Sequence, residues 1–470
     1  MTMSAFNKTV FTSLISLASA GATAGGFAVV TNGDNDGVGS LRYALETKQA
    51  STIFVVPSVD MINLESTLNY EPKKRLRLLG SGQTLKLDKN ETLLSVNNGA
   101  NLFVSDLILE GKPGFFSIEN RGDLNGEKAG KGIFVDVRDD QTGAVNVSLR
   151  DVKVVGFANH GVHISDCDLA DDCGAGAGGG GNGSPASVYV SMVNSTIADV
   201  GNGKFDADGL RVDDRGDGDI VFFSRNSVFT NVGADGVELD EGDNGSIYTD
   251  IVKTEFTYNG NYCDPSLMES FLPSEPEGEF DEGEVTPDQI PLPVTGSFDD
   301  TCIERSVDLY DDGTVEEYEF ALDLDDGIDL DEAGEGSIYS LMIKSTIKYN
   351  LDEGVDYDEE GPGGIEAGFI KNLAENNNDD GFKLSEEDEG DVGVFVKRTK
   401  ALDNGGEGFT FEEEGDGNLD AVVIRTTAEG NKKSKKDGIE AVQEDAGEGT
   451  LRLIKSNIPD GLKLEGVTQL

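Results

Sequence analysis

The chain has 470 residues, of which 90 are Asp or Glu and 37 are Lys or Arg, so its formal net charge is −53. A surface this acidic repels nucleic acid and anionic lipid, so neither is expected as a partner. Extreme charge is also typical of disordered chains, but the regular spacing of apolar residues described below predicts a folded protein instead.

The first residues are typical of an export signal. Lys8 precedes a short apolar run at residues 10–20, and Ala22-Thr23-Ala24 has the small-x-small form of a cleavage site. We therefore expect residues 1–24 to be a signal peptide, and the mature protein to be secreted or held at the cell surface, with the periplasm as another compartment. No later segment is long and apolar enough to span a membrane.

Four cysteines agree with an exported chain. Cys167 and Cys173 lie in a Gly-rich segment, and Cys263 and Cys302 bracket an acidic one. Local pairs in an exported protein predict two disulfides, Cys167–Cys173 and Cys263–Cys302, rather than a zinc site, because CxxC spacing and clustered histidines are missing. We expect a single domain at residues 25–470, with loop insertions at about 166–187 and 262–325 and no second hydrophobic core.

A 27-residue repeat runs through the second half of the chain. An acidic residue and a glycine mark each repeat, and apolar and polar residues then alternate, as in Val237-Glu238-Leu239. Repeats of this length are typical of solenoids, and the alternation predicts strands with their apolar side chains inside. The marker glycines are Gly209, Gly236, Gly327, Gly354, Gly381, Gly408, Gly438 and Gly461.

Each regular repeat contains three predicted short strands and no helix. The second strands begin at an apolar residue eleven places after the marker, such as Ile247, and the third carry another one twenty places after it, such as Phe256. This pattern predicts an all-β fold, a right-handed parallel β-helix. The residues expected to stack inside on one strand face are Leu239, Leu330, Tyr357, Leu384 and Phe411.

An acidic hexad that ends in glycine follows the first strand of six repeats, at residues 213–218, 240–245, 331–336, 358–363, 385–390 and 412–417. Coils of a β-helix stack about 4.8 Å apart, so equivalent carboxylates form columns that repel one another. Two interpretations stay open: a solvated face in salty surroundings, or an edge of hard oxygen ligands that binds Ca²⁺. No hexad has EF-hand spacing. The candidate metal ligands are Asp213, Asp214, Asp240, Glu241, Asp331, Glu332, Asp358 and Glu359.

A second column is basic and lies seventeen residues after six of the markers. Its members either pair with nearby acids or form a track for an anionic polysaccharide. They are Lys253, Lys344, Lys371, Arg398, Arg425 and Lys455.

The repeats, together with the segment GSLRYALE at residues 39–46, resemble the pectate-lyase-like superfamily of exported bacterial β-helix proteins. The resemblance implies a short amphipathic helix that caps the first coil, with Leu41, Ala44 and Leu45 on its apolar face. It leaves the function open, because this fold carries lyases, hydrolases, esterases, adhesins and structural proteins.

The same resemblance raises the possibility of an enzyme. Calcium-dependent β-helix lyases need acidic metal ligands and an Arg or Lys base, but the WxDH-type and RxPxxR-type segments are absent here, and His160 and His163 are interpreted as ordinary strand residues. We therefore expect an exported cation-binding protein with a cell-surface, matrix or carbohydrate-binding role. The alternative is a Ca-dependent polysaccharide lyase or another polysaccharide-degrading enzyme. The lyase candidates are Asp208, Arg211, Asp213, Asp235, Glu238 and Lys253.

The final residues, 460–470, reach a marker strand without a recognisable capping helix. Leu462 and Leu464 are expected to point inward there. We expect this end to be covered by the acidic loop at 264–301, by the last residues themselves or by another subunit. End-to-end self-association would bury the exposed strand edges.

Overall fold

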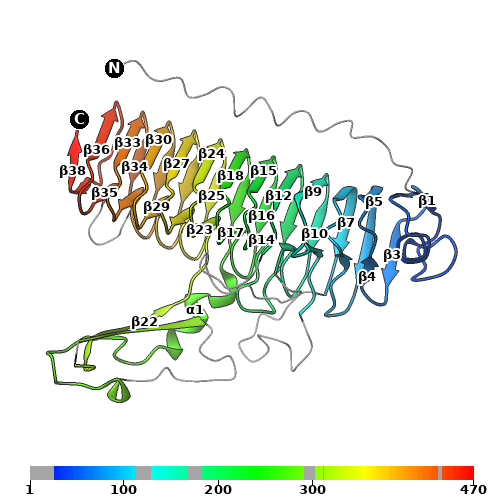
Figure 1. The fold of residues 1–470 in the computed structure, drawn as a ribbon, viewed down its shortest axis with the longest axis horizontal. Coiled ribbons are helices and arrows are strands. Elements are labelled where there is room, and N and C mark those ends of the chain that lie inside the picture. The colour runs from blue at the N-terminus through cyan, green and yellow to red at the C-terminus, as the bar shows by residue number, and fades with distance from the viewer. Residues whose placement is uncertain (1–25, 113–128, 168–182, 291–301, 311, 432–436) are drawn as a thin grey trace.

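The computed structural model describes residues 26–112, 129–167, 183–290, 302–310, 312–431 and 437–470. These residues wind into a solenoid with two long parallel sheets (Figure 1). The 12-stranded sheet, called sheet B here, takes one strand from each coil. Its strands are β4 (Leu68–Tyr70), β6 (Leu94–Val96), β8 (Ile133–Asp136), β11 (Val162–Ser165), β14 (Leu210–Asp214), β17 (Val237–Glu241), β23 (Asp329–Glu332), β26 (Asp356–Glu359), β29 (Lys383–Glu386), β32 (Thr410–Glu413), β35 (Ile439–Gln443) and β37 (Leu462–Glu465).

The 23-stranded sheet, called sheet A, takes two strands from each regular coil, with a sharp bend between them. Its strands are β1 (Phe27–Val30), β2 (Thr52–Val55), β3 (Met61–Leu64), β5 (Leu76–Leu87), β7 (Leu102–Glu110), β9 (Gly143–Arg150), β10 (Lys153–Val155), β12 (Ala186–Val193), β13 (Thr196–Ala198), β15 (Ile220–Arg225), β16 (Val228–Thr230), β18 (Ile247–Val252), β19 (Glu255–Thr257), β24 (Ile338–Ile343), β25 (Thr346–Lys348), β27 (Ile365–Ile370), β28 (Leu373–Glu375), β30 (Val392–Lys397), β31 (Lys400–Leu402), β33 (Leu419–Ile424), β34 (Thr427–Glu429), β36 (Gly449–Ile454) and β38 (Val467–Gln469).

Neighbouring coils pair in the register that the repeat predicts. Ile338 lies opposite Ile365, one 27-residue period further on, and Ile247 lies opposite Ile338 across the insertion. Each regular coil holds three strands, as in β17, β18 and β19 followed by β23, β24 and β25. The predicted fold is confirmed: a parallel β-helix, right-handed as parallel crossovers almost always are.

The hydrophobic core runs along the whole solenoid, from Ala28 to Leu451. Burying each large apolar side chain stabilises the fold by about 1.5–3 kcal/mol, so the stacked coils share one continuous source of stability. The predicted stack on the first strand of each coil is confirmed, because all of its members are 0 % exposed: Leu239, Leu330, Tyr357, Leu384 and Phe411.

Close stacking, rather than a left-handed backbone, explains the repeated glycines. A Cβ atom on the marker Gly236 would lie 2.4 Å from the carbonyl oxygen of Gly327. A Cβ atom on Gly336, which ends a hexad, would lie 1.6 Å from the carbonyl oxygen of Gly245. Neither Gly236 nor Gly336 has a positive φ. Glycine is therefore required here because the next coil's backbone occupies the space of a side chain.

The N-terminal end of the solenoid is capped as the resemblance implies. A single helical turn, η1 (Tyr43–Thr47), lies beside β1 and β4, with Ala44 and Leu45 buried. Leu41, just before it, is also buried. The predicted signal peptide at residues 1–24 lies outside the described residues. Among those that are described, no helix is long and apolar enough to cross a membrane.

At the other end, the last residues continue the sheets. The strand β37 pairs with β35, and β38 pairs with β36. Leu462 and Leu464 pack against the core as expected, but both remain partly exposed. The acidic insertion projects from the side of the solenoid near its middle (Figure 1), so the chain's own β38, rather than that insertion, forms the last layer.

The acidic insertion is a small structured unit, not a loop. It contains η4 (Asn261–Cys263), α1 (Pro265–Met268), η5 (Glu269–Phe271), η6 (Pro287–Gln289) and an antiparallel sheet of β20 (Glu277–Glu279), β21 (Ile303–Leu309) and β22 (Val315–Leu322). Ile290, Val315, Tyr318 and Phe320 belong to a hydrophobic cluster of its own, which corrects the expectation of no second core. Alternation on β22 buries Tyr318 and Phe320, and an irregularity at Glu316 and Glu317 brings Val315 to the same buried face.

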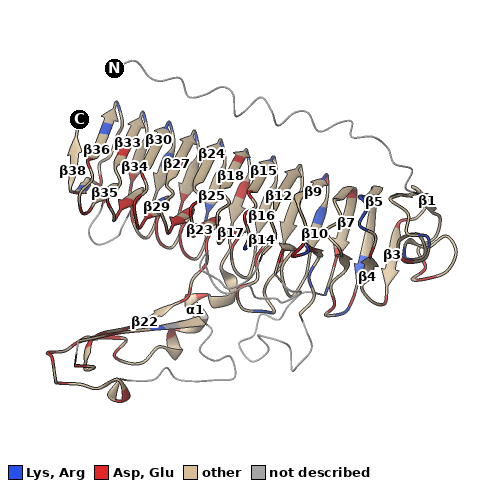
Figure 2. Cartoon of the chain, in the orientation of Figure 1, with Lys and Arg blue, Asp and Glu red and all other residues tan. Residues whose placement is uncertain are grey.

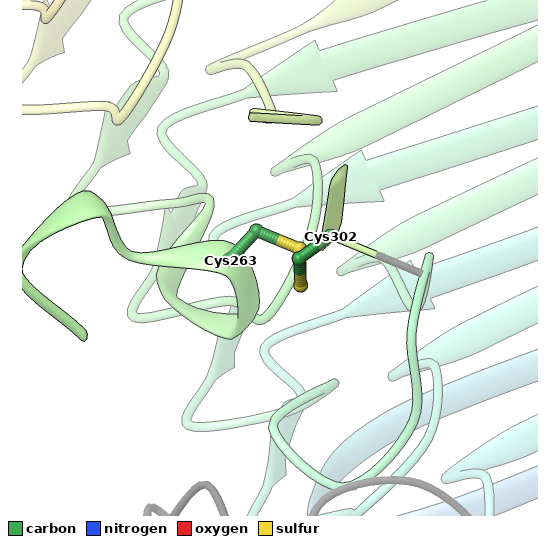
Figure 3. The surroundings of a disulfide bond; sticks show 2 residues. All are labelled: Cys263 and Cys302. Atoms are coloured by element: carbon green, nitrogen blue, oxygen red, sulfur yellow. A yellow bond between two sulfur atoms is a disulfide. The ribbon is translucent and has the colours of Figure 1, made fainter. Parts of the chain in front are cut away.

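The predicted disulfide at the base of this insertion is confirmed. Cys263 and Cys302 are bonded, with their Cα atoms 5.4 Å apart (Figure 3). The other predicted disulfide involves Cys173, which lies outside the described residues, so that pairing stays a prediction.

Candidate functional site

The hexads stack into the two predicted columns on sheet B. Asp213 lies opposite Asp240, and Asp240 lies opposite Asp331. The second column begins with Asp214 opposite Glu241, and the same register continues through β32. Figure 2 shows the Asp and Glu residues of these strands along one edge of the solenoid. The two columns differ in burial, however, and therefore in what they can bind.

The second column points into the protein and is fully buried. Five of its glutamates form what we call the glutamate ladder. Three of them accept a backbone hydrogen bond from a hexad glycine: Glu332 from Gly336 at 3.1 Å, Glu386 from Gly390 at 2.8 Å and Glu413 from Gly417 at 2.9 Å. The ladder therefore closes the turns of the β-helix. Its members are Glu241, Glu332, Glu359, Glu386 and Glu413, each 0 % exposed.

The glutamate ladder is protonated more readily than ordinary glutamate. Burial, followed by a hydrogen bond and the charge of Glu332, raises the pKa of Glu359 to about 10. Burial also raises the pKa of Glu413 to about 7. At neutral pH, protons shared between neighbouring carboxyl groups offset the repulsion along this column. The burial of these residues contradicts the solvated-face interpretation, whereas calcium binding at this column stays a prediction.

The ladder ends on an amide instead of an acid. Gln443 lies opposite Glu413, and its Nε2 donates to the carbonyl oxygen of Gly417 at 3.3 Å. Its Oε1 accepts from the backbone nitrogen of Leu419 at 2.9 Å. A neutral side chain that both donates and accepts fills the same buried position, which agrees with carboxyl groups that carry protons.

The first column points outward, and its first two acids are paired with arginine. Arg211 donates from Nε to Asp213 at 2.8 Å, from Nη1 to Glu238 at 2.7 Å and from Nη2 to Asp240 at 2.9 Å. Arg215 donates to the same Asp240 oxygen, Oδ2, at 3.2 Å. All of these side chains are buried. Two guanidinium groups therefore balance part of the negative charge in this part of the column.

A chain of polar contacts extends from Asp213 to a lysine. His163 Nε2 lies 2.6 Å from Asp213 Oδ2, and Lys131 Nζ lies 2.5 Å from His163 Nδ1. Burial, followed by the charge of Lys131, lowers the pKa of His163 to about 4. The neutral imidazole therefore accepts from Lys131 and donates to Asp213. Burial opposes ionisation of Asp213, but Arg211 and His163 still hold the pKa of Asp213 below its usual range.

His160 lies beside this chain of contacts. Its ring centroid is 4.7 Å from that of His163, and its Nδ1 accepts from the backbone nitrogen of Asp208 at 2.8 Å. Its Nε2 is buried without a hydrogen-bond partner. From the sequence we predict ordinary strand positions for both histidines, whereas the structure places them in a polar network. The irregular early coils hide this, because Lys131, His163 and Arg211 do not follow the 27-residue spacing.

Further along, the outward acids have few basic partners. Asp331 and Asp358 are partly exposed, and the carboxyl groups of Asp331 and Asp240 contact each other. Lys383 pairs with Asp356 at 2.9 Å. We call these outward acids, which lie between Arg211 and Lys383, the carboxylate strip: Glu238, Asp240, Asp329, Asp331, Asp356 and Asp358. In this strip the buried Oδ1 atoms without a hydrogen-bond partner belong to Asp240, Asp329, Asp356 and Asp358.

Burial and mutual repulsion govern the titration of the carboxylate strip. Burial, and then the charges of Asp240 and Asp358, raise the pKa of Asp331 well above its usual range. Burial raises the pKa of Asp358 to about 8, with Asp356 adding to the shift. Either protons or bound cations must therefore offset the charge here at neutral pH.

Groups of acids whose oxygens lie within 4.8 Å of one another identify places where a cation fits. One group, Glu238, Asp240 and Asp331, belongs to the carboxylate strip. The other groups found in the described part of the chain contain acids that directly precede a marker glycine. They are Asp206, Asp208 and Glu238; Asp326, Asp352 and Glu353; Asp379, Asp380 and Glu407; and Glu407, Asp437 and Glu440.

Of the acids before the marker glycines, only Asp208 and Asp235 were candidates, and the others were missed, although all of them define the repeat. Asp208 Oδ1 accepts from the backbone nitrogen of Asp235 on the next coil at 3.0 Å, and Asp235 accepts in the same way from Asp326. Their first role is thus to connect adjacent coils. The sequence does show an acid before every marker glycine, but an acid at that position is equally typical of a turn.

Most of the predicted lyase residues come together. Arg211 contacts the carboxylates of Asp213 and Glu238 directly. The side chain of Asp208 accepts a hydrogen bond from the backbone nitrogen of Asp235. Lys253 does not join them, because it lies at the bend between β18 and β19 of sheet A. Of the two basic candidates, Arg211 therefore lies among the predicted acids and Lys253 does not, and Lys131 provides a different lysine nearby.

Comparisons with known proteins find only distant structural similarity. No family model and no curated protein matches the chain. Among solved structures, it is similar to the A-module of the Azotobacter vinelandii mannuronan C-5 epimerase AlgE4, at 13 % identity and a TM-score of 0.39 over 94 % of this chain and 96 % of that one. It is also similar to the Dettilon tailspike protein, at 12 % identity and a TM-score of 0.35 over 89 % of this chain and 62 % of that one.

A third solved structure is the ORF18 protein of Geobacillus virus E2, at 10 % identity and a TM-score of 0.38. The likeness covers 77 % of this chain but only 53 % of that protein, so the chain spans about half of its length. These likenesses concern the β-helix fold alone.

Proposed function

We propose that the protein is an exported β-helix protein that binds divalent cations, with Ca²⁺ the expected ion, on the carboxylate strip of sheet B. The observation that carries this proposal is the group Glu238, Asp240 and Asp331. Oxygens of all three lie within 4.8 Å of one another, and Asp240 Oδ1 is buried without a hydrogen-bond partner. Clustered carboxylate oxygens are the ligands that Ca²⁺ prefers.

The ends of the strip support a cation between them. Arg211 neutralises Asp240 at one end, and Lys383 neutralises Asp356 at the other. Between these two bases the outward positions of sheet B hold only acids, including Asp329 and Asp331. Where the chain supplies no basic side chain, a bound divalent cation would play the same electrostatic part.

The role that we propose is at the cell surface or in an extracellular matrix, with an acidic polysaccharide as the partner. The predicted export signal and the confirmed disulfide agree with an extracellular location.

Cation binding can be tested by thermal unfolding of the mature protein. CaCl₂ should raise the melting temperature more than NaCl of equal ionic strength, because a ligand at a hundredfold excess over its Kd stabilises the folded state by about 2.7 kcal/mol. Asp331→Asn should lose this response. Asp416→Asn, which removes the same charge from an exposed hexad position, should keep it. Equal responses to the two salts would refute the proposal.

A second candidate function, a polysaccharide lyase, is favoured by one observation. His163 is neutral and lies between the Lys131 ammonium and the Asp213 carboxylate, an arrangement suited to moving a proton. Against it, His163 is 1 % exposed and both of its ring nitrogens are occupied. The test is ultraviolet detection of unsaturated uronate products from polygalacturonate and polymannuronate, with His163→Ala as the control.

A further inference from the structure

The predicted basic column lies on the edge of the solenoid opposite the hexads. We call it the basic row: Lys253, Lys344, Lys371, Arg398, Arg425 and Lys455. Each member lies at the sharp bend in sheet A, for example between β24 and β25 or between β27 and β28. All six side chains are exposed, and Figure 2 shows Lys and Arg recurring along this edge.

The backbone at the bend makes a basic side chain an unexpected choice. The six residues have φ between 53° and 62°, in the left-handed region that Asn and Asp tolerate better than Lys and Arg. The same bend in earlier coils carries Asp106, Asp151, Asn194 and Asn226, with φ between 50° and 54°. From residue 253 onward every bend is basic instead, so the local conformation does not explain the residue type.

Neighbouring coils stabilise the earlier bends through side chains. Asn194 Nδ2 donates to Asp151 Oδ1 at 3.1 Å, and Asn226 Nδ2 donates to Asn194 Oδ1 at 3.1 Å. A stack of Lys and Arg cannot form such bonds, because neither side chain has an acceptor. The basic row therefore gives up a local ladder of hydrogen bonds and adds repulsion between like charges.

Nearby acids do not account for the row. No Asp or Glu lies within two residues of the last five members, and only Glu255 lies that close to the first. None of the six takes part in the ion pairs found among the described residues, whereas Lys348 and Lys383 do. Partly exposed aliphatic side chains flank it instead, such as Ile343, Ile370 and Ile424.

From these observations we infer that the basic row binds a linear acidic polysaccharide with one carboxylate or sulfate on each sugar or each second sugar. Successive members are about 4.8 Å apart, the distance between coils, and the row extends over about 24 Å. A pyranose ring in an extended chain is close to one coil in length, so acidic groups and cations can meet repeatedly. The flanking isoleucines offer contact to the apolar faces of the rings.

The geometry favours a thin polymer over a membrane. The Debye length is about 8–10 Å at physiological ionic strength, and the two sheets of the solenoid lie about 10 Å apart. A single chain along the basic row therefore stays largely screened from the acids of sheet B. An extended anionic membrane would face much more of a protein whose net charge is −53.

This inference deepens the proposed function by naming the class of polysaccharide, and it rests on the proposed role but not on the cation site. The basic row and the carboxylate strip belong to different sheets. The two proposals can therefore fail separately.

Affinity electrophoresis of the mature protein in gels that contain polygalacturonate, polymannuronate or chondroitin sulfate tests the inference, with dextran as the neutral polymer. A chelator is present throughout, so that cation bridges do not contribute. The test variant is Lys371→Asn, Arg398→Asn and Arg425→Asn combined, because Asn adopts the left-handed bend readily in the earlier coils. The matched control is Lys73→Asn, Lys74→Asn and Arg75→Asn combined, which removes the same charge from exposed positions elsewhere.

The wild type should be retarded by at least one acidic polymer and not by dextran. The test variant should bind at least tenfold more weakly at low ionic strength, whereas the control variant should keep its affinity within about twofold. Asp331→Asn should bind as the wild type does, which separates the basic row from the cation site.

Three outcomes would overturn the inference. The first is a wild type that no acidic polymer retards, and the second is an equal loss in both triple variants. The third is binding to vesicles of phosphatidylglycerol and phosphatidylcholine without binding to any of the polymers, which would assign the row to a lipid surface.

Discussion

The acids of sheet B have different partners in two neighbouring regions. Around β11, β14 and β17, buried carboxylates are paired with Arg211, Arg215 and His163. From β23 to β32 the same register places carboxyl groups against one another, with Lys383 as the one base of that stretch on the outward face. The backbone is the same in both regions, so the fold does not dictate how charge is balanced. Fixed cations serve the first region, and protons or mobile ions must serve the second.

The largest effect is expected from removing the fixed cation of the first region. Arg211→Met should lower the free energy of unfolding by about 3–5 kcal/mol, because it leaves Asp213, Glu238 and Asp240 buried without their partner. Urea unfolding followed by circular dichroism measures this. The exposed Arg398→Asn is the control and should change stability by less than about 0.5 kcal/mol. A mild effect of Arg211→Met would mean that the two regions are not distinct.

The second region should lose stability as the pH rises. Burial, with the neighbouring Glu386 adding to it, raises the pKa of Glu413 from 4.5 to about 7. Because the folded-state pKa is the higher one, the stabilisation is complete below pH 4.5 and is lost as the pH rises through 7. Glu413→Gln should remove about 2 kcal/mol of this decline. Melting temperatures between pH 5 and 8 test it, and a parallel decline in both proteins would contradict it.

Lys383 is the place where the second region resembles the first. Lys383→Met should lower the free energy of unfolding by about 1–2 kcal/mol in a chelator, because Asp356 loses its basic partner while the lysine is partly exposed. It should also increase the stabilisation by CaCl₂, since an ion can then reach Asp356 and Asp358. Lys348→Met, whose ion pair with Glu375 lies on sheet A, is the control and should leave the response to calcium unchanged.

The smallest effect is expected at the end of the glutamate ladder. Gln443→Glu should cost about 1 kcal/mol at pH 8, because an ionised carboxylate would face the carbonyl oxygen of Gly417 instead of donating to it. At pH 5 the added carboxyl group carries a proton and can still donate, so the cost should nearly vanish. A cost that does not depend on pH would point to packing rather than charge.

The fold could be predicted because one physical constraint recurs in every coil. Glycines such as Gly236 stand where the next coil's carbonyl oxygen leaves no room for a side chain, and Leu239 or Leu330 must face the core. Both constraints recur with the 27-residue period and are therefore visible in the sequence. Strict alternation after Leu239 also places Glu241 inside, although we predicted a solvated or cation-binding edge for both columns of the hexads.

The polar network could not be predicted in the same way. Lys131, His163 and Arg211 lie on coils of unequal length, so their mutual register is fixed only when the strands pair. The place of Lys253 within the repeat was predicted, but its location at a left-handed bend was not, because a lysine does not indicate such a backbone conformation. The 27-residue period thus predicts which residues lie side by side on regular coils, but it does not do so on irregular coils.

The insertion between β19 and β23 shows how freely this solenoid can be rebuilt. Tyr248 and Tyr339 are 91 residues apart, yet they occupy opposite positions on adjacent strands, as Tyr339 and Glu366 do at the ordinary interval. The strand pairing of the solenoid is therefore the same whether a short turn or the whole insertion connects two coils at that corner. The disulfide between Cys263, at the end of η4, and Cys302, just before β21, closes the departing unit near its root. Such a corner is a natural grafting point, where a new appendage can be gained, lost or exchanged while the rest of the molecule keeps its design.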